Sequence, residues 1–319
     1  MSLAEHVRIL GRGPGRARSL TEAEATDAMT LMLSGHAAPE AIGALLMLMR
    51  MKGETAEEIA GFAQAAQTHL VGCPPADLDW PCYAAGRSRG QPWFLLAARL
   101  VAQSGVRVLL HGWNGDDSRV RDALGPLGIP WARNADAART ALDGPGIAYL
   151  SLEDGHPALF SLLALRSKLG LRSCINTVCR MLNPGRAPAS VQGVFHPSYR
   201  ALQADAAARL DWHSLTVIKG GGGEFERHPG KEVAAFGLRA GTGWQHAFPA
   251  LSDDVRRLAD LTTTGAALAE LWDADRGPSF GRALVMGTAA LAFETVGVPN
   301  GMDAAHRLWP TRHAAPRAA

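Results

Sequence analysis

A glycine-flanked loop that carries two arginines is the first segment of this sequence that could do chemistry. Gly86, Arg87, Ser88, Arg89 and Gly90 follow an expected strand and precede an expected helix. Backbone N–H groups at the start of a helix, with guanidinium groups beside them, can bind a phosphate. The loop is neither a Walker loop nor a GxGxxG motif, so a plain strand-to-helix turn is the competing interpretation.

Positive charge is concentrated in two stretches that contain no acid, residues 80–115 and 155–204. Their cations are Arg87, Arg89, Arg99, Arg107, Arg166, Lys168, Arg172, Arg180, Arg186 and Arg200. If the two stretches fold together, they form a positive cleft that attracts phosphates. Only four of the 32 basic residues are lysine, which favours planar phosphate contacts, although a GC-rich genome produces the same bias.

A second loop with polar side chains follows the second expected strand. It reads His111, Gly112, Trp113, Asn114 and Gly115. The ends of strands are where ligands bind in α/β sheets. The Asn-Gly pair is also an ordinary turn signal, so a connecting loop is the alternative.

The second acid-free stretch adds further candidates. His156 leads into a helical segment, and Arg166, Lys168, Arg172 and Asn176 follow it. These cations could bind an anion together. They could equally lie at a solvated helix C-terminus, where positive charge is favourable.

Four glycines after Lys219 lead into Glu224 and Glu226, which would share one face of an extended chain. Carboxylates could hold Mg²⁺ at this place, and an exposed flexible turn is the alternative. The two glutamates are therefore only candidate metal ligands. No Ser–His–Asp order, HExxH motif, zinc spacing or Cys–His nucleophile stands out in the sequence.

Helices are expected to fill residues 1–72. Capping boxes at Thr21–Glu24 and Thr55–Glu58 each precede a stripe of apolar residues at helical spacing. A methionine-rich stripe in the same region suits a hydrophobic core or a subunit interface. This part reads as an all-helical small domain.

Beyond the break at Cys73-Pro74-Pro75, short strands alternate with helices. Strands are expected at 82–85, 106–111, 147–152 and 215–219, and helices at 94–102, 201–210, 253–272, 283–295 and 302–308. Such alternation predicts βαβ units with a mainly parallel sheet. Residues 73–319 therefore read as a larger α/β domain.

The composition sets wider limits. The chain has 319 residues with 47% apolar and 19% charged residues, which excludes wholesale disorder, and its net charge of +2 excludes an overall polybasic character. The N-terminus lacks the apolar core of a signal peptide, and no apolar run approaches the roughly 18–20 residues of a membrane span. Four cysteines without a CxxC pair favour a reducing cytoplasm.

Several segments together resemble the anthranilate phosphoribosyltransferase-like family, which shares its fold with pyrimidine nucleoside phosphorylases. RSKLGLRSCINTVCRMLNP at 166–184 resembles the family's most distinctive stretch, RxxLGxRTxFNxLGPLxNP, and GVFHPSY at 193–199 matches the piece after it. SLEDGHPALF resembles the region with the family's HPA, and PEAIGALLMLMRMKGETAEEIAGF resembles its helical domain. The resemblance covers nearly the whole chain.

The resemblance implies a fold and an assembly. Helices near 157–182 would join the N-terminal helical domain, and the active site would lie in the cleft between this domain and the α/β domain. Members typically form homodimers through the helical domain, which would explain the methionine stripe as an interface.

The chain departs from the family at the residues that bind phosphoribosyl pyrophosphate. The GTGGD loop reads GRSRG at 86–90, the NxST segment reads QPWFL at 91–95, and KHGNR reads LHGWN at 110–114. The Asp-Glu magnesium pair falls on Phe225-Glu226, whereas Arg166, His156 and Asn176 are retained. A departing pyrophosphate needs preorganised positive charge and normally Mg²⁺. Arginine can hold a phosphate but cannot hold the metal.

This pattern resembles the divergent YbiB-like branch, for which nucleic-acid binding without strong sequence preference is implied. The leading hypothesis is a catalytically degenerate, cytoplasmic homodimer that binds single-stranded DNA or RNA. Its phosphate contacts would be Arg87, Arg89, Arg166, Lys168 and Arg172, in a cleft with Gly86, His111, Gly112, Trp113, Asn114, His156 and Asn176. Trp93 and Trp113 would offer stacking surfaces.

The competing hypothesis is an active glycosyl or phosphoribosyl transferase with an altered substrate. It would bind a phosphorylated small molecule and would require Mg²⁺ at Glu224 and Glu226. A third hypothesis is a sensor of a small metabolite or an assembly partner that uses the cleft.

Overall fold

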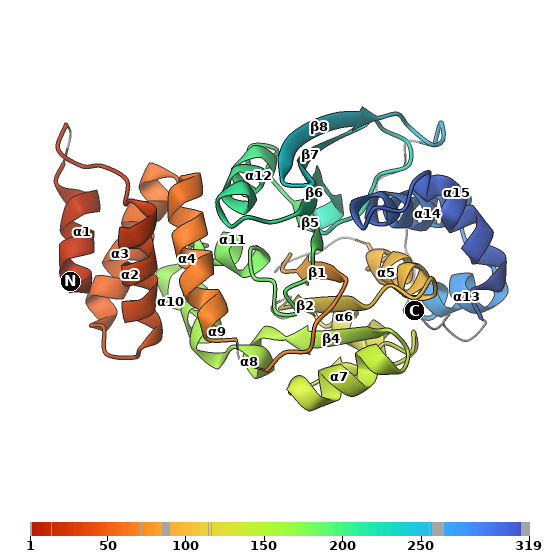
Figure 1. The fold of residues 1–319 in the computed structure, drawn as a ribbon, viewed down its shortest axis with the longest axis horizontal. Helices are drawn as coiled ribbons and strands as arrows, with labels where there is room; N and C mark the ends of the chain where they lie inside the picture. The colour runs from red at the N-terminus through yellow and green to blue at the C-terminus, as the bar shows by residue number, and fades with distance from the viewer. Residues whose placement is uncertain are drawn as a thin grey trace.

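The helices of the N-terminal region gather at one end of the molecule, the sheet lies in the middle, and the C-terminal helices lie at the other end (Figure 1). The computed structural model describes residues 2–13, 15–70, 72–84, 90–113, 115, 117–254, 256 and 265–313. No helix within these ranges is both long and apolar enough to cross a membrane. All four cysteines are free thiols.

Four helices form the N-terminal region: α1 (Leu3–Gly11), α2 (Glu22–Leu33), α3 (Pro39–Lys52) and α4 (Ala56–Thr68). Both capping boxes are confirmed. Thr21 and Thr55 each accept a hydrogen bond from the backbone N–H three residues later, and the glutamate there returns a bond to the threonine N–H. These reciprocal bonds fix where α2 and α4 begin.

The glutamate of the second capping box also connects the N-terminal helices to one another. Glu58 is fully buried, and its carboxylate accepts hydrogen bonds from the N–H groups of Leu20 and Thr55 at 2.9 Å each. Lys52 Nζ lies 2.8 Å from the same carboxylate. One side chain therefore fixes the segment before α2, the end of α3 and the start of α4.

The methionine stripe is mostly core within one chain. Met29, Met32 and Met49 are buried among the N-terminal helices, whereas Met51 is 82% exposed. Apolar side chains of α9 (Pro157–Ala164) and α11 (Ile175–Arg180) pack into the same core. This packing carries the 157–180 segment from the sheet to the helical end of the molecule (Figure 1).

Eight strands form one sheet in the order β3-β4-β2-β1-β5-β6-β7-β8. The neighbours from β3 to β6 pair in parallel, and β7 and β8 continue the sheet as an antiparallel hairpin. The strands are β1 (Leu78–Cys82), β2 (Val108–Gly112), β3 (Trp131–Ala132), β4 (Ile147–Ser151), β5 (Ala189–Val194), β6 (Ser214–Lys219), β7 (Val233–Arg239) and β8 (Thr242–Phe248). The mainly parallel sheet expected from the sequence is thus confirmed.

Helices cover both faces of the sheet, which is why the parallel strands are buried throughout. Trp80, Leu110 and Tyr149 point into one core, while Leu109 and Leu150 point into another on the opposite face. The remaining helices are α5 (Phe94–Ala102), α6 (Arg119–Leu124), α7 (Ala135–Asp143), α8 (Leu152–Gly155), α10 (Arg166–Leu169), α12 (Tyr199–Arg209), α13 (Gly265–Ala274), α14 (Ser279–Thr295) and α15 (Gly301–Leu308), with the 3₁₀ turns η1 (Gly221–Gly223) and η3 (Trp309–Thr311).

The structure differs from the predicted elements in several places. The first strand was predicted to begin at Cys82, but it ends there. Pro81 lies inside β1, and a proline argues against a strand in the sequence. Strands β3, β5, β7 and β8 were missed: β3 has two residues, β5 contains polar and glycine residues, and most of β8 is exposed. Part of the expected helix at 253–272 is confirmed as α13, whereas residues 253, 254 and 256 are not helical.

We expect Glu58→Ala to destabilise the fold by about 3 kcal/mol, because it leaves buried N–H groups without acceptors. Chemical denaturation measures this change. Glu57→Ala is the matched control, since Glu57 precedes it on α4 and its side chain, which is 40% exposed, pairs with Arg209 at the surface. The control should cost about 1 kcal/mol or less, and equal losses for the two variants would contradict the role given to Glu58.

Candidate functional site

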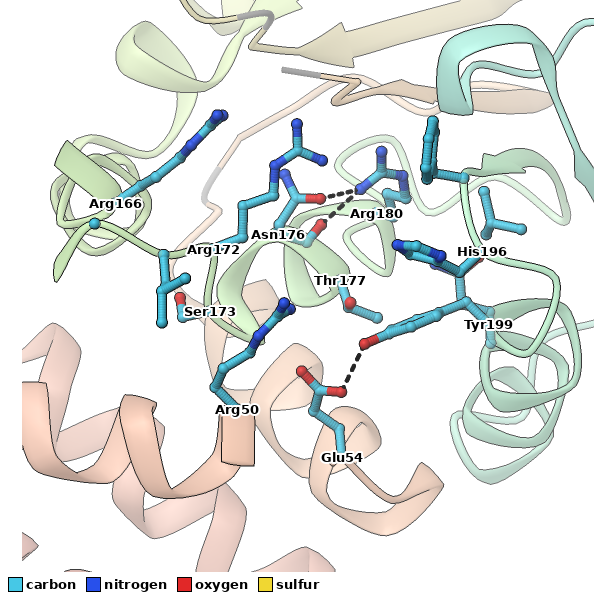
Figure 2. Close-up of a pocket in the computed structure, with 15 residues that line it drawn as sticks. Arg50, Glu54, Arg166, Arg172, Ser173, Asn176, Thr177, Arg180, His196 and Tyr199 are labelled. Carbon is cyan, nitrogen blue, oxygen red and sulfur yellow. Dashed lines mark hydrogen bonds between the residues drawn. The ribbon is translucent and has the colours of Figure 1, made fainter. Parts of the chain in front are cut away.

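A pocket lies between the end of α3, the 166–180 segment and the turn after β5 (Figure 2). Its volume is about 300 Å³. Four arginines line it, with one carboxylate and three aromatic rings: Arg50, Arg166, Arg172, Arg180, Glu54, Phe195, His196 and Tyr199. We call this the arginine pocket. Its walls come from the helical end of the molecule and from the sheet, so it is a cleft between the two.

Each arginine reaches the pocket from a different piece of structure. Arg50 extends from the last turn of α3, and Arg166 from the start of α10. Gly170 ends α10 in the left-handed conformation with φ 69°, and Arg172 follows in the turn before α11. Figure 2 shows the arginine side chains directed toward the same space.

Arg180 is the fixed member of this group. It is 7% exposed, its Nη1 donates to the backbone oxygen of Asn176, and its Nε donates to the backbone oxygen of Gly193 at 3.2 Å. Asn176 Oδ1 accepts a further bond from Nη1 and the Asn176 amide donates to the carbonyl of Tyr83. These bonds join α11 to the ends of β5 and β1 beneath the pocket.

The guanidinium groups act on one another. Burial, followed by the charges of Arg166, Arg180 and Arg50, lowers the pKa of Arg172. Like charges held close together cost free energy unless an anion lies between them. The pocket is therefore arranged electrostatically to accept an anion.

A single carboxylate lines the arginine pocket among the described residues, and it is already engaged. Tyr199 Oη donates to Glu54 Oε2 at 2.9 Å. Burial and the Glu54 charge raise the pKa of Tyr199 to about 12, so its hydroxyl stays protonated at neutral pH. The four arginines outweigh this one acid.

An apolar ring stands at the rim of the arginine pocket. Phe195 is 58% exposed, and its ring meets His196 edge-on at 4.9 Å between centroids. A phenyl ring so exposed beside cations offers a flat surface on which a planar group can stack.

The structure brings together only some of the site residues that were predicted from the sequence. Arg166, Arg172 and Asn176 line the arginine pocket, whereas Lys168 is exposed on α10 outside it. Gly86, Arg87, Arg89 and Asn114 lie outside the described residues.

His111 is buried rather than exposed in the cleft. It is 2% exposed, its Nε2 lies 3.1 Å from Asp79 Oδ1, and its Nδ1 lies 2.9 Å from Tyr83 Oη. Ser190 donates to the other oxygen of Asp79 at 2.8 Å. This network connects β1, β2 and β5 inside the core and does not reach the arginine pocket.

The neighbours of His111 are structural as well. A Cβ on Gly112 would lie 2.1 Å from the backbone oxygen of Cys82, so glycine permits the close approach of β1 and β2. Trp113 is half-buried and packs edge-on against Phe160. Trp93 is fully buried. Neither tryptophan lines the arginine pocket, where Phe195 and His196 are the exposed rings.

His156 is also buried, and it caps a helix. Its Nδ1 accepts from the N–H of Leu159 at 3.3 Å, and its Nε2 lies 3.1 Å from the backbone oxygen of Ala66. It therefore starts α9 and joins it to α4.

The two candidate metal ligands do not fit Mg²⁺. Glu224 and Glu226 are each 1% exposed, and each accepts a hydrogen bond from a backbone N–H. Phe225, at the other place of the expected pair, points into the core. Mg²⁺ keeps several waters in its octahedral shell, and buried carboxylates leave no room for them. No cluster of three potential metal ligands occurs within the described ranges.

Six residues of the arginine pocket were not predicted as site residues: Arg50, Glu54, Arg180, Phe195, His196 and Tyr199. All six lie in the motifs quoted for the family resemblance, and Arg180 was counted among the cations. Arg50 and Glu54 come from the helical region, and only the packing of α3 against the 166–180 segment brings them to the pocket.

Comparisons with known proteins support the same architecture. Residues 5–70 match the glycosyl transferase family helical bundle domain, and residues 94–247 match the glycosyl transferase family a/b domain. The chain is 30% identical over 289 residues to the anthranilate phosphoribosyltransferase of Novosphingobium aromaticivorans, covering 87% of this chain and 88% of that protein. The chain belongs to the anthranilate phosphoribosyltransferase family.

Other relatives and solved structures agree with this assignment. The chain is 32% identical to the enzyme of Geobacillus stearothermophilus, but the match spans 61% of that protein. The crystal structure of the Thermus thermophilus enzyme superposes with a TM-score of 0.80 at 25% identity, covering 98% of this chain and 96% of that one. The Saccharomyces cerevisiae enzyme in complex with PRPP and Mg shares the fold, with a TM-score of 0.76 at 17% identity over 98% of this chain and 93% of that one.

We expect the stability of this protein to fall at mildly acidic pH through His156. Burial lowers the pKa of His156, so below its unfolded value of about 6.5 the unfolded chain binds more protons than the folded one. Its contribution is complete above that pH and is lost as the pH falls further. His156→Asn, which can still cap α9, should flatten the fall in Tm between pH 7.5 and 5.5. The exposed His36→Asn should leave the fall unchanged, and identical profiles for all three proteins would contradict this role.

Proposed function

We propose that the arginine pocket binds single-stranded nucleic acid without strong sequence preference. The observation that carries this proposal is the convergence of four arginines beside the exposed ring of Phe195. Guanidinium groups neutralise phosphates, and an exposed aromatic ring stacks on an unpaired base. These are the two contacts that sequence-tolerant binding of a single strand requires.

The balance of charge supports binding over metal-dependent catalysis. Glu54 is held by Tyr199, and Arg180 is held by α11 and β5, so the pocket has a fixed positive wall. The carboxylates expected to hold Mg²⁺ are buried elsewhere. A phosphodiester backbone needs no metal to bind here, because the guanidinium groups supply the positive charge.

The wider biological setting belongs to the same proposal. A reducing cytoplasm suits a chain with four free thiols. The family resemblance suggests a homodimer joined through the helical domain, and the exposed Met51 at the end of α3 is consistent with such a contact.

The test is fluorescence anisotropy with a labelled single-stranded oligonucleotide across a salt series. We expect log K to fall linearly with log salt, and Arg166→Ala with Arg172→Ala to weaken binding roughly tenfold or more for every sequence tried, with a shallower salt slope. Arg139→Ala, an exposed arginine on α7, is the matched control and should change neither quantity. Absence of binding at low salt, or a double variant that binds like the control, would refute the proposal.

Phosphoribosyl or glycosyl transfer is the second candidate function. The observations that favour it are the relatives and the solved neighbours, which are named as anthranilate phosphoribosyltransferases, and the retention of Arg166 and Asn176 in the arginine pocket. On this reading the pocket would hold the acceptor of the reaction, and a phosphorylated sugar would be the donor.

Calorimetry with phosphoribosyl pyrophosphate separates the two candidates. If the chain binds nucleic acid only, we expect no Mg²⁺-dependent binding of phosphoribosyl pyrophosphate in the calorimeter. The reason is that no described carboxylate pair is open to the metal. Saturable binding that requires Mg²⁺, followed by release of pyrophosphate when anthranilate is added, would establish the transferase instead. Oligonucleotide binding in the same preparation shows that the protein is folded and competent.

A further inference from the structure

Lys219 and the four glycines after it form a motif that the arginine pocket by itself does not explain. Lys219 is the last residue of β6, and the glycines lead from it to Glu224. Only four of the 32 basic residues are lysine, so an exposed lysine at the end of a central strand is unusual in this chain. Its position relative to the pocket decides what it can contact.

Lys219 lies directly beside a residue of the arginine pocket. It is the register partner of Val194 in the parallel pair of β5 and β6, and Val194 lines the pocket. Neighbouring strands lie about 4.8 Å apart. The N–H of Gly220 donates to the carbonyl oxygen of Val194 at 3.2 Å, which holds the two strand ends together. The backbone of Lys219 is therefore one strand away from the wall of the pocket.

The side chain of Lys219 leaves the sheet on the same face as the pocket. Side chains alternate between the two faces along a strand. Leu215 and Val217 pack in the core shared with the N-terminal helices, as does Val194, whereas Ile218 packs in the core on the other face. Lys219 follows Leu215 and Val217 at the same spacing of two, and it is exposed. Its ammonium, on a flexible four-carbon stem, can therefore reach a phosphate at the rim of the pocket.

The exposed ring of Phe195 borders both the pocket and the glycine turn η1. Phe195 lines the pocket, and a Cβ added to Gly223 would lie 3.5 Å from the Phe195 Cβ. Gly222 and Gly223 have φ angles of 64° and 92°, in the left-handed region that favours glycine. Because the turn carries no side chains, it does not cover the ring, and Phe195 is 58% exposed.

A single strand of several nucleotides is longer than the arginine pocket. The volume of about 300 Å³ is small for a ligand site, so such a strand has to leave the pocket over its rim. On the side of β6, the rim carries a stacking ring, Phe195, and next to it a cation, Lys219. Bases stacked on aromatic rings and a backbone followed by positive charge are the two features of sequence-tolerant single-strand sites.

We propose that Lys219 is a second phosphate contact, which holds the strand after it has left the arginine pocket across the ring of Phe195. The site then binds an oligonucleotide through at least two phosphates, one among the arginines and one at Lys219. A single nucleotide engages the pocket alone. This inference rests on the proposed nucleic-acid function and extends it, because it names the path of the strand and requires a ligand longer than one nucleotide.

The test is fluorescence anisotropy with a labelled oligonucleotide of about ten nucleotides, within the roughly 4–16 nucleotides that one such site covers. Lys219→Ala should weaken binding several-fold for every sequence and make the salt slope shallower by about 0.7, the contribution of one phosphate on a single strand. Lys219→Arg, which keeps the charge, should bind like the unmodified protein. An unlabelled nucleoside monophosphate should compete with the same inhibition constant in Lys219→Ala and in the unmodified protein, because it stays within the arginine pocket.

The matched control is Arg139→Ala, which removes one positive charge from the exposed surface of α7, a helix packed on β3 and β4. It should change neither the affinity nor the salt slope. Lys219 is exposed, so we expect its variants to fold, and a Tm equal to that of the unmodified protein verifies this.

Three results would overturn the inference, and each differs from the others. If Lys219→Ala binds the oligonucleotide like Arg139→Ala, Lys219 is not a contact, and the proposed function stands on the arginine variants alone. If Lys219→Ala weakens the monophosphate as much as the oligonucleotide, Lys219 belongs to the pocket itself and the exit path is wrong. If the unmodified protein binds no oligonucleotide at low salt, the proposed function fails and this inference fails with it.

Discussion

Repulsion between like charges is the constraint on which the site depends. Four guanidinium groups face one cavity, and bringing them together costs free energy that other parts of the structure must offset. Arg180 is held by backbone oxygens of α11 and β5, and Arg50 and Arg166 come from helices fixed by apolar packing. The fold keeps these cations close together, and Glu54 is the one acid that lines the pocket among the described residues.

The open and the buried parts of this region differ in charge. The arginine pocket is open, positive and bordered by an exposed ring. Glu224 and Glu226 are buried outside it, and each accepts a hydrogen bond from a backbone N–H.

Several buried histidines and acids hold elements of the fold together. His111 and Asp79 join three strands inside the core, and His156 begins α9. Glu58 joins parts of the helical region, where its carboxylate accepts hydrogen bonds from the N–H groups of two separate segments. Buried polar residues of this kind stabilise the fold, because each forms a hydrogen bond with a buried group that would otherwise have no partner. Family membership is therefore carried by the fold, while function depends on side chains that face the open cavity.

The sequence by itself determined the helical region, its two capping boxes, the alternation that gives a parallel sheet, and the family. These features depend on residues close together in the chain, where spacing and capping chemistry are legible. The sequence also placed Arg166, Arg172 and Asn176 in one motif. Only the tertiary structure decided that Arg50, Glu54 and Phe195 join them and that His111 and Glu226 turn inward. A side chain's exposure and its distant partners are set by the packing of whole helices and strands, and residue type alone does not specify that packing.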